Sequence, residues 1–526
     1  MSAAPTTAAE LRAWLLSGDE LAVLDAREQG QFATDHLFWA SCVPLSSLER
    51  RVAALVPRRD CPVVWVDADG AEDGLAARAA RRLGELGWTN VSTLAGGMPA
   101  WPGEHYSGVN VASKAFGEWV ERLEHTPHLS AVELARRQAQ GERIVIVDSR
   151  PMREFHRMSI PGGIDCPGAE LVYRIHDLAP DPDTTIVVNC AGRTRSIIGA
   201  QSLRNAGIAN PVLALEGGTM GWELAGLTLD HGQTAHAAPP SAPSLAVAME
   251  AAGRVARRFG VPTLDLATLQ GWLADTTRTT FVLDVRSAEE YDAGHSPGAR
   301  HAAGGQIVQA TDEYVGVLGA RVVLVDDASL VRATMTASWL AQLGRYQVAV
   351  VRLDDAVKAG PAPSNPAIPS STVGVPTIEA AALAARLEGV HVIDLADSLR
   401  YRRGHIPGAW WAVRARFDKL ADIGAPVVLV SPDDELARWA WPDAEGRWPG
   451  TTVLAGGTAA WVAGGHGLEA GMTRPTTDTD DVWYKPYDAQ DETVARQHMR
   501  DYLEWEVELL NQIDGDALVA FRAFPA

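Results

Sequence analysis

The chain has 526 residues, 47% of them hydrophobic and 21% charged, with a formal net charge of −20. That length predicts about three or four domains rather than one core, and the acidic charge argues against a surface that binds nucleic acid or an anionic membrane. No apolar run approaches the ~20 residues of a membrane-spanning helix, and the N-terminus lacks the basic start and cleavage site of a signal peptide. We therefore expect a cytoplasmic protein of several domains.

The predicted elements recur four times in the same order. Each copy opens with a helix that follows Ser or Thr, which are common N-caps; these residues are Thr7, Ser130, Thr263 and Thr377. A short β-branched run ending in Asp comes next, as is typical of a parallel strand buried on both faces. The four acids are Asp25, Asp148, Asp284 and Asp394.

Each copy then continues through a turn to a second buried strand. The turn reads S-I-P-G-G at 159–163, G-H-S-P-G-A at 294–299 and G-H-I-P-G-A at 404–409, and it is degraded at 35–40. The second strand ends at Asp67, Cys190, Asp327 or Ser431. A Gly-Gly-x-x-x-Trp motif follows in three copies and ends at Trp101, Trp222 and Trp461. Strands alternating with helices at a period of roughly 110–135 residues predict repeated α/β units with small parallel sheets.

These copies set the predicted domain boundaries. Four α/β domains are expected at 1–106, 126–234, 261–358 and 375–472, with linkers at 107–125, 235–260 and 359–374. Ala-, Pro- and Ser-rich stretches at 235–244 and 360–371 predict exposed linkers. The remaining segment, 473–526, is predicted to be a tail with one helix, whose apolar stripe docks on the body of the protein. The stripe consists of Met499, Tyr502, Leu503, Val507 and Leu510.

The four cysteines are Cys42, Cys61, Cys166 and Cys190. None forms a C-x-x-C pair, so their spacing predicts neither a zinc site nor a disulfide framework. Cys42, Cys61 and Cys166 are interpreted as small buried hydrophobic residues in a reducing compartment. A role for Cys166 as a resolving thiol is a minor alternative.

The order Asp-x-Arg, G-H-x-P-G-A, strand plus loop, and G-G-x-x-x-W resembles the rhodanese sulfurtransferase domain, over about four-fifths of the chain. In that family the catalytic cysteine ends the second strand and begins a loop that leads into a helix. The resemblance therefore implies that Cys190 is catalytic. The copies with Asp67, Asp327 and Ser431 at this position are predicted to be structural or to bind partners.

The loop after Cys190 is predicted to bind the anionic part of a substrate. Its residues are Ala191, Gly192, Arg193, Thr194, Arg195 and Ser196. Backbone N–H groups at a helix N-terminus, the helix dipole and two arginines together favour a thiolate, which is the nucleophile. The loop departs from the family pattern, which often has Arg directly after Cys, and this leaves the preferred donor open.

Asp148 and Arg150 are expected to lie behind the site, where the family's equivalent pair ties the first strand to neighbouring loops. Arg153, Arg157 and Arg174 are weaker candidates for the lip of a substrate site.

The resemblance implies transfer of sulfane sulfur from a donor such as thiosulfate or 3-mercaptopyruvate, through a Cys190 persulfide, to a thiol, a protein acceptor or cyanide. No metal or organic cofactor is expected, and a homo-oligomer is compatible with the sequence. One alternative is a non-enzymatic sulfur carrier or scaffold. The other is a cysteine phosphatase, but those enzymes use Cys-x5-Arg, and Cys190 to Arg195 is one residue shorter.

Overall fold

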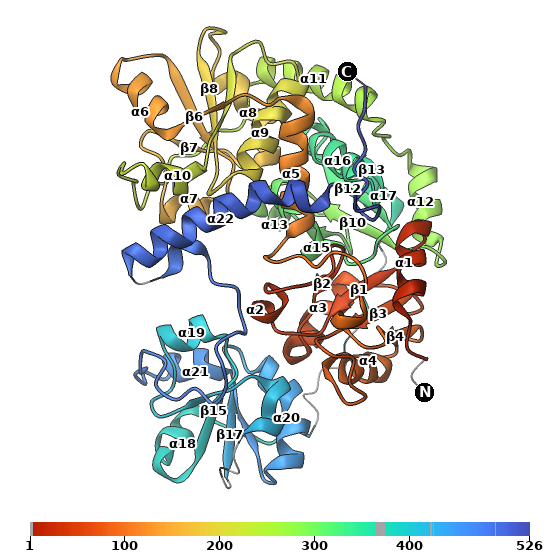
Figure 1. Ribbon diagram of the computed structural model, residues 1–526, viewed down its shortest axis with the longest axis vertical. Helices are drawn as coiled ribbons and strands as arrows, with labels where there is room; N and C mark the ends of the chain where they lie inside the picture. The colour runs from red at the N-terminus through yellow and green to blue at the C-terminus, as the bar shows by residue number, and fades with distance from the viewer. Residues whose placement is uncertain are drawn as a thin grey trace. The chain divides into compact units, whose positions relative to one another are not determined.

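The protein is described from a computed structural model, drawn in Figure 1, that covers residues 4–362, 365–366, 368, 374–420, 423, 426–489 and 491–525. Much of the predicted linker at 359–374 lies outside these residues. The chain divides into two compact units. The first consists of Met1–Leu11, Val23–Val109 and Pro366–Tyr484, and the second of Arg12–Ala22, Asn110–Asn365 and Lys485–Ala526.

The second unit contains two parallel sheets. One has the order β5-β9-β8-β6-β7, from β5 (His128–Leu129), β6 (Ile144–Asp148), β7 (Ile164–Asp165), β8 (Thr185–Asn189) and β9 (Val212–Leu215). The other has the order β11-β10-β12-β13, from β10 (Thr280–Asp284), β11 (Arg300–His301), β12 (Arg321–Asp326) and β13 (Gln347–Arg352). Their central strands are almost wholly buried, as the continuous β-branched runs predict.

The first unit repeats this arrangement. Its sheets have the orders β2-β1-β3-β4 and β14-β18-β17-β15-β16. The strands are β1 (Ala22–Asp25), β2 (Ser41–Cys42), β3 (Val63–Val66), β4 (Val91–Thr93), β14 (Thr377–Ile378), β15 (His391–Asp394), β16 (Trp410–Trp411), β17 (Val427–Val430) and β18 (Thr452–Leu454). In the two four-stranded sheets, single parallel bridges, Thr6–Leu94 and Thr263–Val350, take the place of the outer fifth strand. The predicted α/β class is thus confirmed, with one strand order in every copy.

Helices flank these sheets. In the second unit they are α5 (Val111–Glu124), α6 (Ala131–Ala139), α7 (Met152–Arg157), α8 (Leu171–Leu178), α9 (Thr194–Asn205), α10 (Gly218–Leu224), α11 (Ala242–Phe259), α12 (Leu266–Ala274), α13 (Ala288–Ala293), α14 (Gly304–Gln309), α15 (Thr311–Tyr314), α16 (Val331–Leu343), α17 (Leu353–Ala359) and α22 (Glu492–Ile513). The others are α1 (Ala8–Ser17), α2 (Gln29–Phe32), α3 (Leu48–Leu55), α4 (Leu75–Glu85), α18 (Ala380–Ala384), α19 (Ser398–Arg403), α20 (Glu435–Arg447) and α21 (Gly457–Ala463).

Two segments predicted as linkers contain packed helices. Within 107–125, α5 buries Val111, Phe116 and Val120, and within 235–260, α11 buries Val255 and Phe259. Buried apolar residues at helical spacing form the packed face of each helix. In 235–260 the Pro- and Ala-rich start of the segment masked this signal. Residues 235–244 are mostly exposed. The boundaries of the four domains remain a prediction.

The tail forms the predicted helix, α22, which lies beside α5 and α10 in the second unit (Figure 1). Met499 is buried as expected, but the predicted stripe is wrong at Val507, which is 45% exposed. Glu506 is buried instead, at 1% exposure. The inward face of α22 therefore carries a carboxyl group where the apolar pattern predicted a hydrophobic residue.

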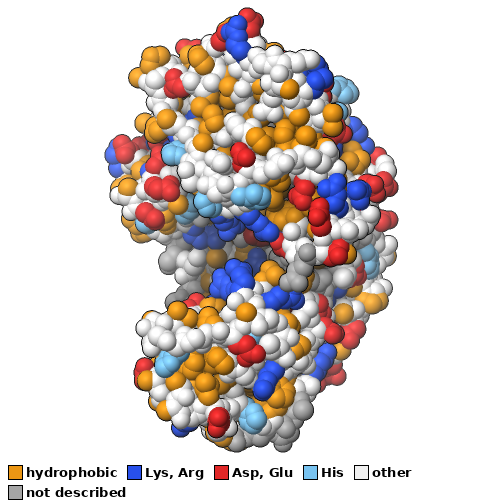
Figure 2. All heavy atoms as spheres, turned by 90° about the vertical axis from the view of Figure 1, so that its left-hand side faces the viewer, with side chains coloured by type: hydrophobic (Ala, Val, Ile, Leu, Met, Phe, Trp, Pro, Cys, Tyr) orange, Lys and Arg blue, Asp and Glu red, His pale blue; other side chains and the backbone are white. Residues whose placement is uncertain are grey.

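On the face drawn in Figure 2, acidic and basic side chains are interspersed with hydrophobic ones. Among the described residues, no helix is both long enough and apolar enough to cross a membrane.

Candidate active site

Cys190 follows the last residue of β8 and begins the loop that leads into α9. Its Sγ lies 3.1 Å from the Ser196 Oγ, and the residue is only 2% exposed. Ser196 comes from the first turn of α9, so the loop folds back on itself and brings the thiol to the start of the helix. Residues 190 and 196, predicted from one motif, are thus brought together.

The residue before Cys190 is held by the predicted Asp148–Arg150 pair. Asn189 Nδ2 donates to Asp148 Oδ2 at 2.6 Å, and the Arg150 guanidinium lies 2.8 Å from the same carboxyl group. Arg150 also donates to the Met158 carbonyl at 2.7 Å. The pair therefore fixes the end of β8 from behind.

The same ion pair recurs where there is no cysteine. Arg27 lies 2.6 Å from Asp25, and Arg286 lies 2.7 Å from Asp284. The pair therefore belongs to the architecture of the repeat.

Arg195 and Arg193 have different surroundings. Arg195 forms two hydrogen bonds with Glu154 of α7, at 2.9 and 3.2 Å. Burial raises the pKa of Glu154, but Arg195 outweighs burial and lowers the pKa to about 2. Arg193 instead pairs with Glu118 and Glu121, at 2.7 Å to the former. Arg195 is thus the arginine whose charge acts on Cys190.

The loop sequence predicted a lowered pKa for Cys190, but the structure indicates a raised one. Burial raises the pKa of the Cys190 thiol above its usual value, although Arg195 and the hydrogen bond from Ser196 act in the opposite direction. The reason is that the thiol lies under covering groups instead of at an open loop, so desolvation disfavours its charged form.

One of these covering elements is α10, which begins with the second glycine of the Gly-Gly-x-x-x-Trp motif. Thr219 N donates to the Cys190 carbonyl at 2.9 Å, and Met220 N donates to the Ala191 carbonyl at 3.1 Å. A Cβ on Gly218 would lie 2.3 Å from the Cys190 carbonyl oxygen. Only glycine allows the backbone to approach this closely, which explains the motif physically.

The other covering element is α22, which sequence reasoning did not connect with the site. Glu506 Oε1 accepts hydrogen bonds from Thr194 Oγ1 at 3.2 Å and from the Tyr502 hydroxyl at 3.1 Å. A Cβ on Gly192 would lie 3.0 Å from Glu506 Oε2 and 3.0 Å from the Met220 Cε. The one feature of the sequence that indicated this contact is the position of Glu506, seven residues after Met499 and therefore on the helix face predicted to dock.

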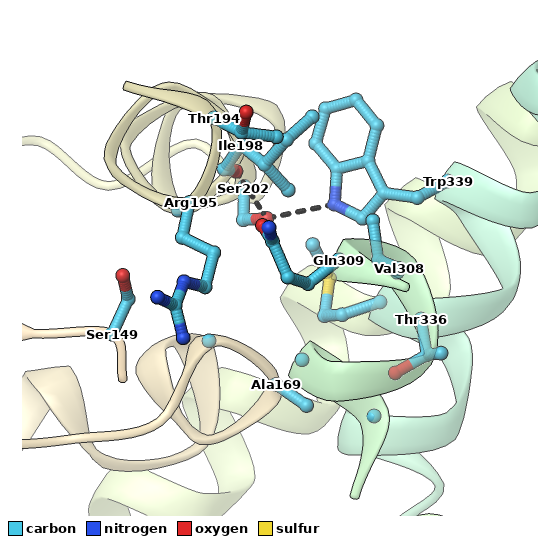
Figure 3. Close-up of a pocket in the computed structure, with 15 residues that line it drawn as sticks. Ser149, Ala169, Thr194, Arg195, Ile198, Ser202, Val308, Gln309, Thr336 and Trp339 are labelled. Carbon is cyan, nitrogen blue, oxygen red and sulfur yellow. Dashed lines mark hydrogen bonds between the residues drawn. The ribbon is translucent and has the colours of Figure 1, made fainter. Parts of the chain in front are cut away.

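A cavity of about 30 Å³ lies next to this loop, within the second unit (Figure 3). Thr194, Arg195 and Ser149 line it on one side, and Gln309 and Trp339 on the other, whereas Cys190 is not among its lining residues. It is large enough for about one or two water molecules. This cavity does not lead a donor to the thiol.

Two of the three weaker candidates form ion pairs away from Cys190. Arg157 lies 2.9 Å from Asp488, and Arg174 lies 2.7 Å from Glu170. Cys166 is fully buried, and burial raises its pKa well above the usual value, as is typical of a cysteine that packs as a small hydrophobic residue. Cys42 and Cys61 are also buried. Among the described residues, no group of His, Cys, Asp or Glu is arranged to hold a metal ion.

In the other copies the residue at the Cys190 position stabilises its own loop. The Asp67 carboxylate accepts from Gly70 N and Ala76 N, both at 2.8 Å. In the third copy the strand register places Asp326, not the predicted Asp327, at this position, because Asp284 pairs with Val325 as Asp148 pairs with Asn189. The Asp326 carboxylate accepts from Ala333 N at 3.0 Å. The Ser431 hydroxyl accepts from Ala437 N at 3.2 Å. These groups supply hydrogen bonds but no nucleophilic sulfur.

Arg332 of the third copy repeats the Arg195 arrangement. Arg332 lies 2.6 Å from Glu290. This pair is the equivalent of Arg195 with Glu154. The third copy has thus kept the arginine and its acid, while Asp326, 2.9 Å from Arg332, stands where the cysteine would be.

Comparisons with known proteins agree with the repeat. The Rhodanese-like domain family matches residues 7–104, 130–225 and 266–357. The crystal structure of a thiosulfate sulfurtransferase from Pseudomonas aeruginosa is 45% identical, covers 99% of this chain and 100% of its own, and superimposes with a TM-score of 0.93. An HTH-type transcriptional regulator of Mycobacterium tuberculosis is 29% identical over 220 residues, which are 41% of this chain and 88% of that protein.

Proposed function

This chain belongs to the rhodanese family and is a sulfurtransferase, and we propose that Cys190 carries sulfane sulfur from a small anionic donor to a thiol or cyanide. One observation carries the proposal. Among the described residues, Cys190 is the cysteine that stands between the second strand of a copy and the following helix. Because thiosulfate is the substrate in the name of the relative that is 45% identical, it is the first donor to test, with 3-mercaptopyruvate as the second.

In the donor half-reaction the Cys190 thiolate attacks the outer sulfur of thiosulfate. The sulfur–sulfur bond of the donor breaks, sulfite leaves with the bonding electron pair, and Cys190 becomes a persulfide. With 3-mercaptopyruvate the carbon–sulfur bond breaks instead, and the carbon takes up a proton to give pyruvate. An acceptor thiolate or cyanide then attacks the terminal sulfur and releases Cys190 as a thiolate.

The neighbouring residues support this chemistry in different ways. Arg195 and the Ser196 hydroxyl stabilise negative charge on Sγ of the thiolate. Asp148, through Asn189, fixes the start of the loop. The loop residues from Ala191 to Thr194 surround the incoming anion, with Arg193 anchoring the loop to α5. Four cysteines among 526 residues are too few for a disulfide framework, which supports a reducing compartment, the cytoplasm.

Two variants test the assignment. Cys190→Ser should abolish thiosulfate- and mercaptopyruvate-dependent turnover, whereas a variant lacking Cys42, Cys61 and Cys166 should remain active. Turnover by Cys190→Ser, or a folded but inactive triple variant, would exclude Cys190 as the nucleophile. Hydrolysis of p-nitrophenyl phosphate that depends on Cys190, without sulfur transfer, would favour the phosphatase alternative. A folded protein with neither activity would favour a carrier or scaffold.

A further inference from the structure

Glu506 is a buried carboxyl group beside the Cys190 loop that the proposed chemistry does not use. Its Oε1 is bonded to Thr194 and Tyr502, whereas its Oε2 has no hydrogen-bond partner among the described residues. This second oxygen faces the backbone at Gly192. A buried polar atom without a partner is costly, so its retention here points to an interaction made when the site is occupied.

The charges around Glu506 decide what such an occupant can be. The neighbouring cations are Arg193, Arg195 and Lys114, the neighbouring acids are Glu118, Glu121 and Glu154, and the uncharged titratable groups are Tyr502 and Cys190. Asp312 and Glu313 act on Lys114 as well. Both arginines are already engaged by carboxylates. Glu506, when ionised, therefore adds a negative charge beside a loop that receives an anion.

We propose that Glu506 is a specificity-determining residue that selects sulfur donors by their charge. As a carboxylate it opposes the dianion thiosulfate more strongly than the monoanion 3-mercaptopyruvate, because the repulsion grows with the charge of the donor. As a carboxylic acid it loses this charge, and the free oxygen can then donate a hydrogen bond to an oxygen of the donor. This inference rests on the proposed function and names the class of donor that the site prefers.

The acid form remains populated at higher pH than in an exposed glutamate. Burial raises the pKa of Glu506, although Lys114 acts in the opposite direction. Use of thiosulfate relative to 3-mercaptopyruvate should therefore be greatest when Glu506 is protonated and should fall as pH rises and Glu506 ionises. The ratio of the two rates is informative because ionisation of Cys190 affects both donors alike and cancels.

The test measures the initial rate of Cys190 persulfide formation from each donor, by mass spectrometry, across the pH range in which Glu506 ionises. Glu506→Gln should raise the thiosulfate-to-mercaptopyruvate ratio by about tenfold where wild-type Glu506 is ionised, since one charge is removed from a buried site. It should also weaken the dependence of the ratio on pH, of which Glu118, with a pKa raised by burial to about 7, keeps a part. Glu504→Gln, on the exposed side of the same helix, removes the same charge and should leave the ratio unchanged.

A merely structural role for Glu506 would slow both donors together and leave their ratio unaltered. An equal ratio in Glu506→Gln and the wild type would overturn the inference. A wild-type ratio that does not change with pH would also overturn it, and that measurement needs no variant. Persulfide from neither donor in any form would overturn the proposed function, and the inference with it.

Discussion

Replacing Gly218 with Ala should displace the loop that carries Cys190. The new Cβ would lie 2.3 Å from the Cys190 carbonyl oxygen and 2.8 Å from its carbonyl carbon, much closer than atoms tolerate. Gly218 also has a φ of 56°, a conformation that costs a residue with a Cβ about 1–2 kcal/mol. Overpacking adds about 1–3 kcal/mol, so we expect a total loss of about 2–5 kcal/mol.

The chemical effect should exceed the loss of stability. Relief of the clash requires the loop or α10 to move by roughly 1 Å, and a displacement of that size can cost on the order of 100-fold in rate. The assay is the single-turnover rate of persulfide formation with thiosulfate, at a temperature at which circular dichroism shows each variant to be folded.

Two matched variants separate strain, clash and chemistry. Gly226→Ala has a φ of 77° but nothing within 4 Å of the new Cβ, so it reports strain alone. Gly457→Ala would place its Cβ 2.0 Å from the Ser431 carbonyl oxygen, which is the same clash in a copy without a cysteine. Both should form persulfide at the wild-type rate. If Gly218→Ala formed persulfide at the same rate as Gly457→Ala, the reasoning would be refuted.

Four further substitutions probe Cys190 and Cys166. Arg195→Ala should raise the Cys190 pKa and slow iodoacetamide alkylation near neutral pH by about tenfold. Arg193→Ala should alter the pH profile of alkylation little, because Glu118 and Glu121 bind that guanidinium. Equal pH profiles for the two variants would contradict this distinction. Ser196→Ala removes the hydrogen bond to Sγ and should slow alkylation by a few-fold, about the effect of one hydrogen bond; a wild-type rate would mean that the bond does not stabilise the thiolate. Cys166→Ser should leave the yield of persulfide unchanged, and a lower yield would restore its role as a resolving thiol.

The features that the sequence predicted well are local. Continuous β-branched runs ending in Asp25, Asp148, Asp284 and Asp394 became the central strands, because burial on both faces demands that pattern. Cys190 could be placed at a strand end from its own neighbours. The repetition of each pattern made the fold class predictable even though each motif alone is weak.

The features that were missed depend on distant contacts. Glu506 accepts a hydrogen bond from Thr194, which is 312 residues away in the sequence. No motif in the tail predicts that contact. Arg193 turns to Glu118, which lies on α5, in a segment interpreted as a linker. The direction of the Cys190 pKa follows from the same cause. Distant segments bury the residue, with α10 against its carbonyl oxygen and Glu506 of α22 beside its loop, and a loop sequence alone cannot show burial.

The most direct test of the central claim is peptide mapping by mass spectrometry after treatment with thiosulfate or 3-mercaptopyruvate. The account predicts one added sulfur atom on the peptide that contains Cys190, and its removal by cyanide or a reducing thiol. An unmodified Cys190 peptide in the folded protein, or added sulfur on Cys42, Cys61 or Cys166 instead, would contradict it.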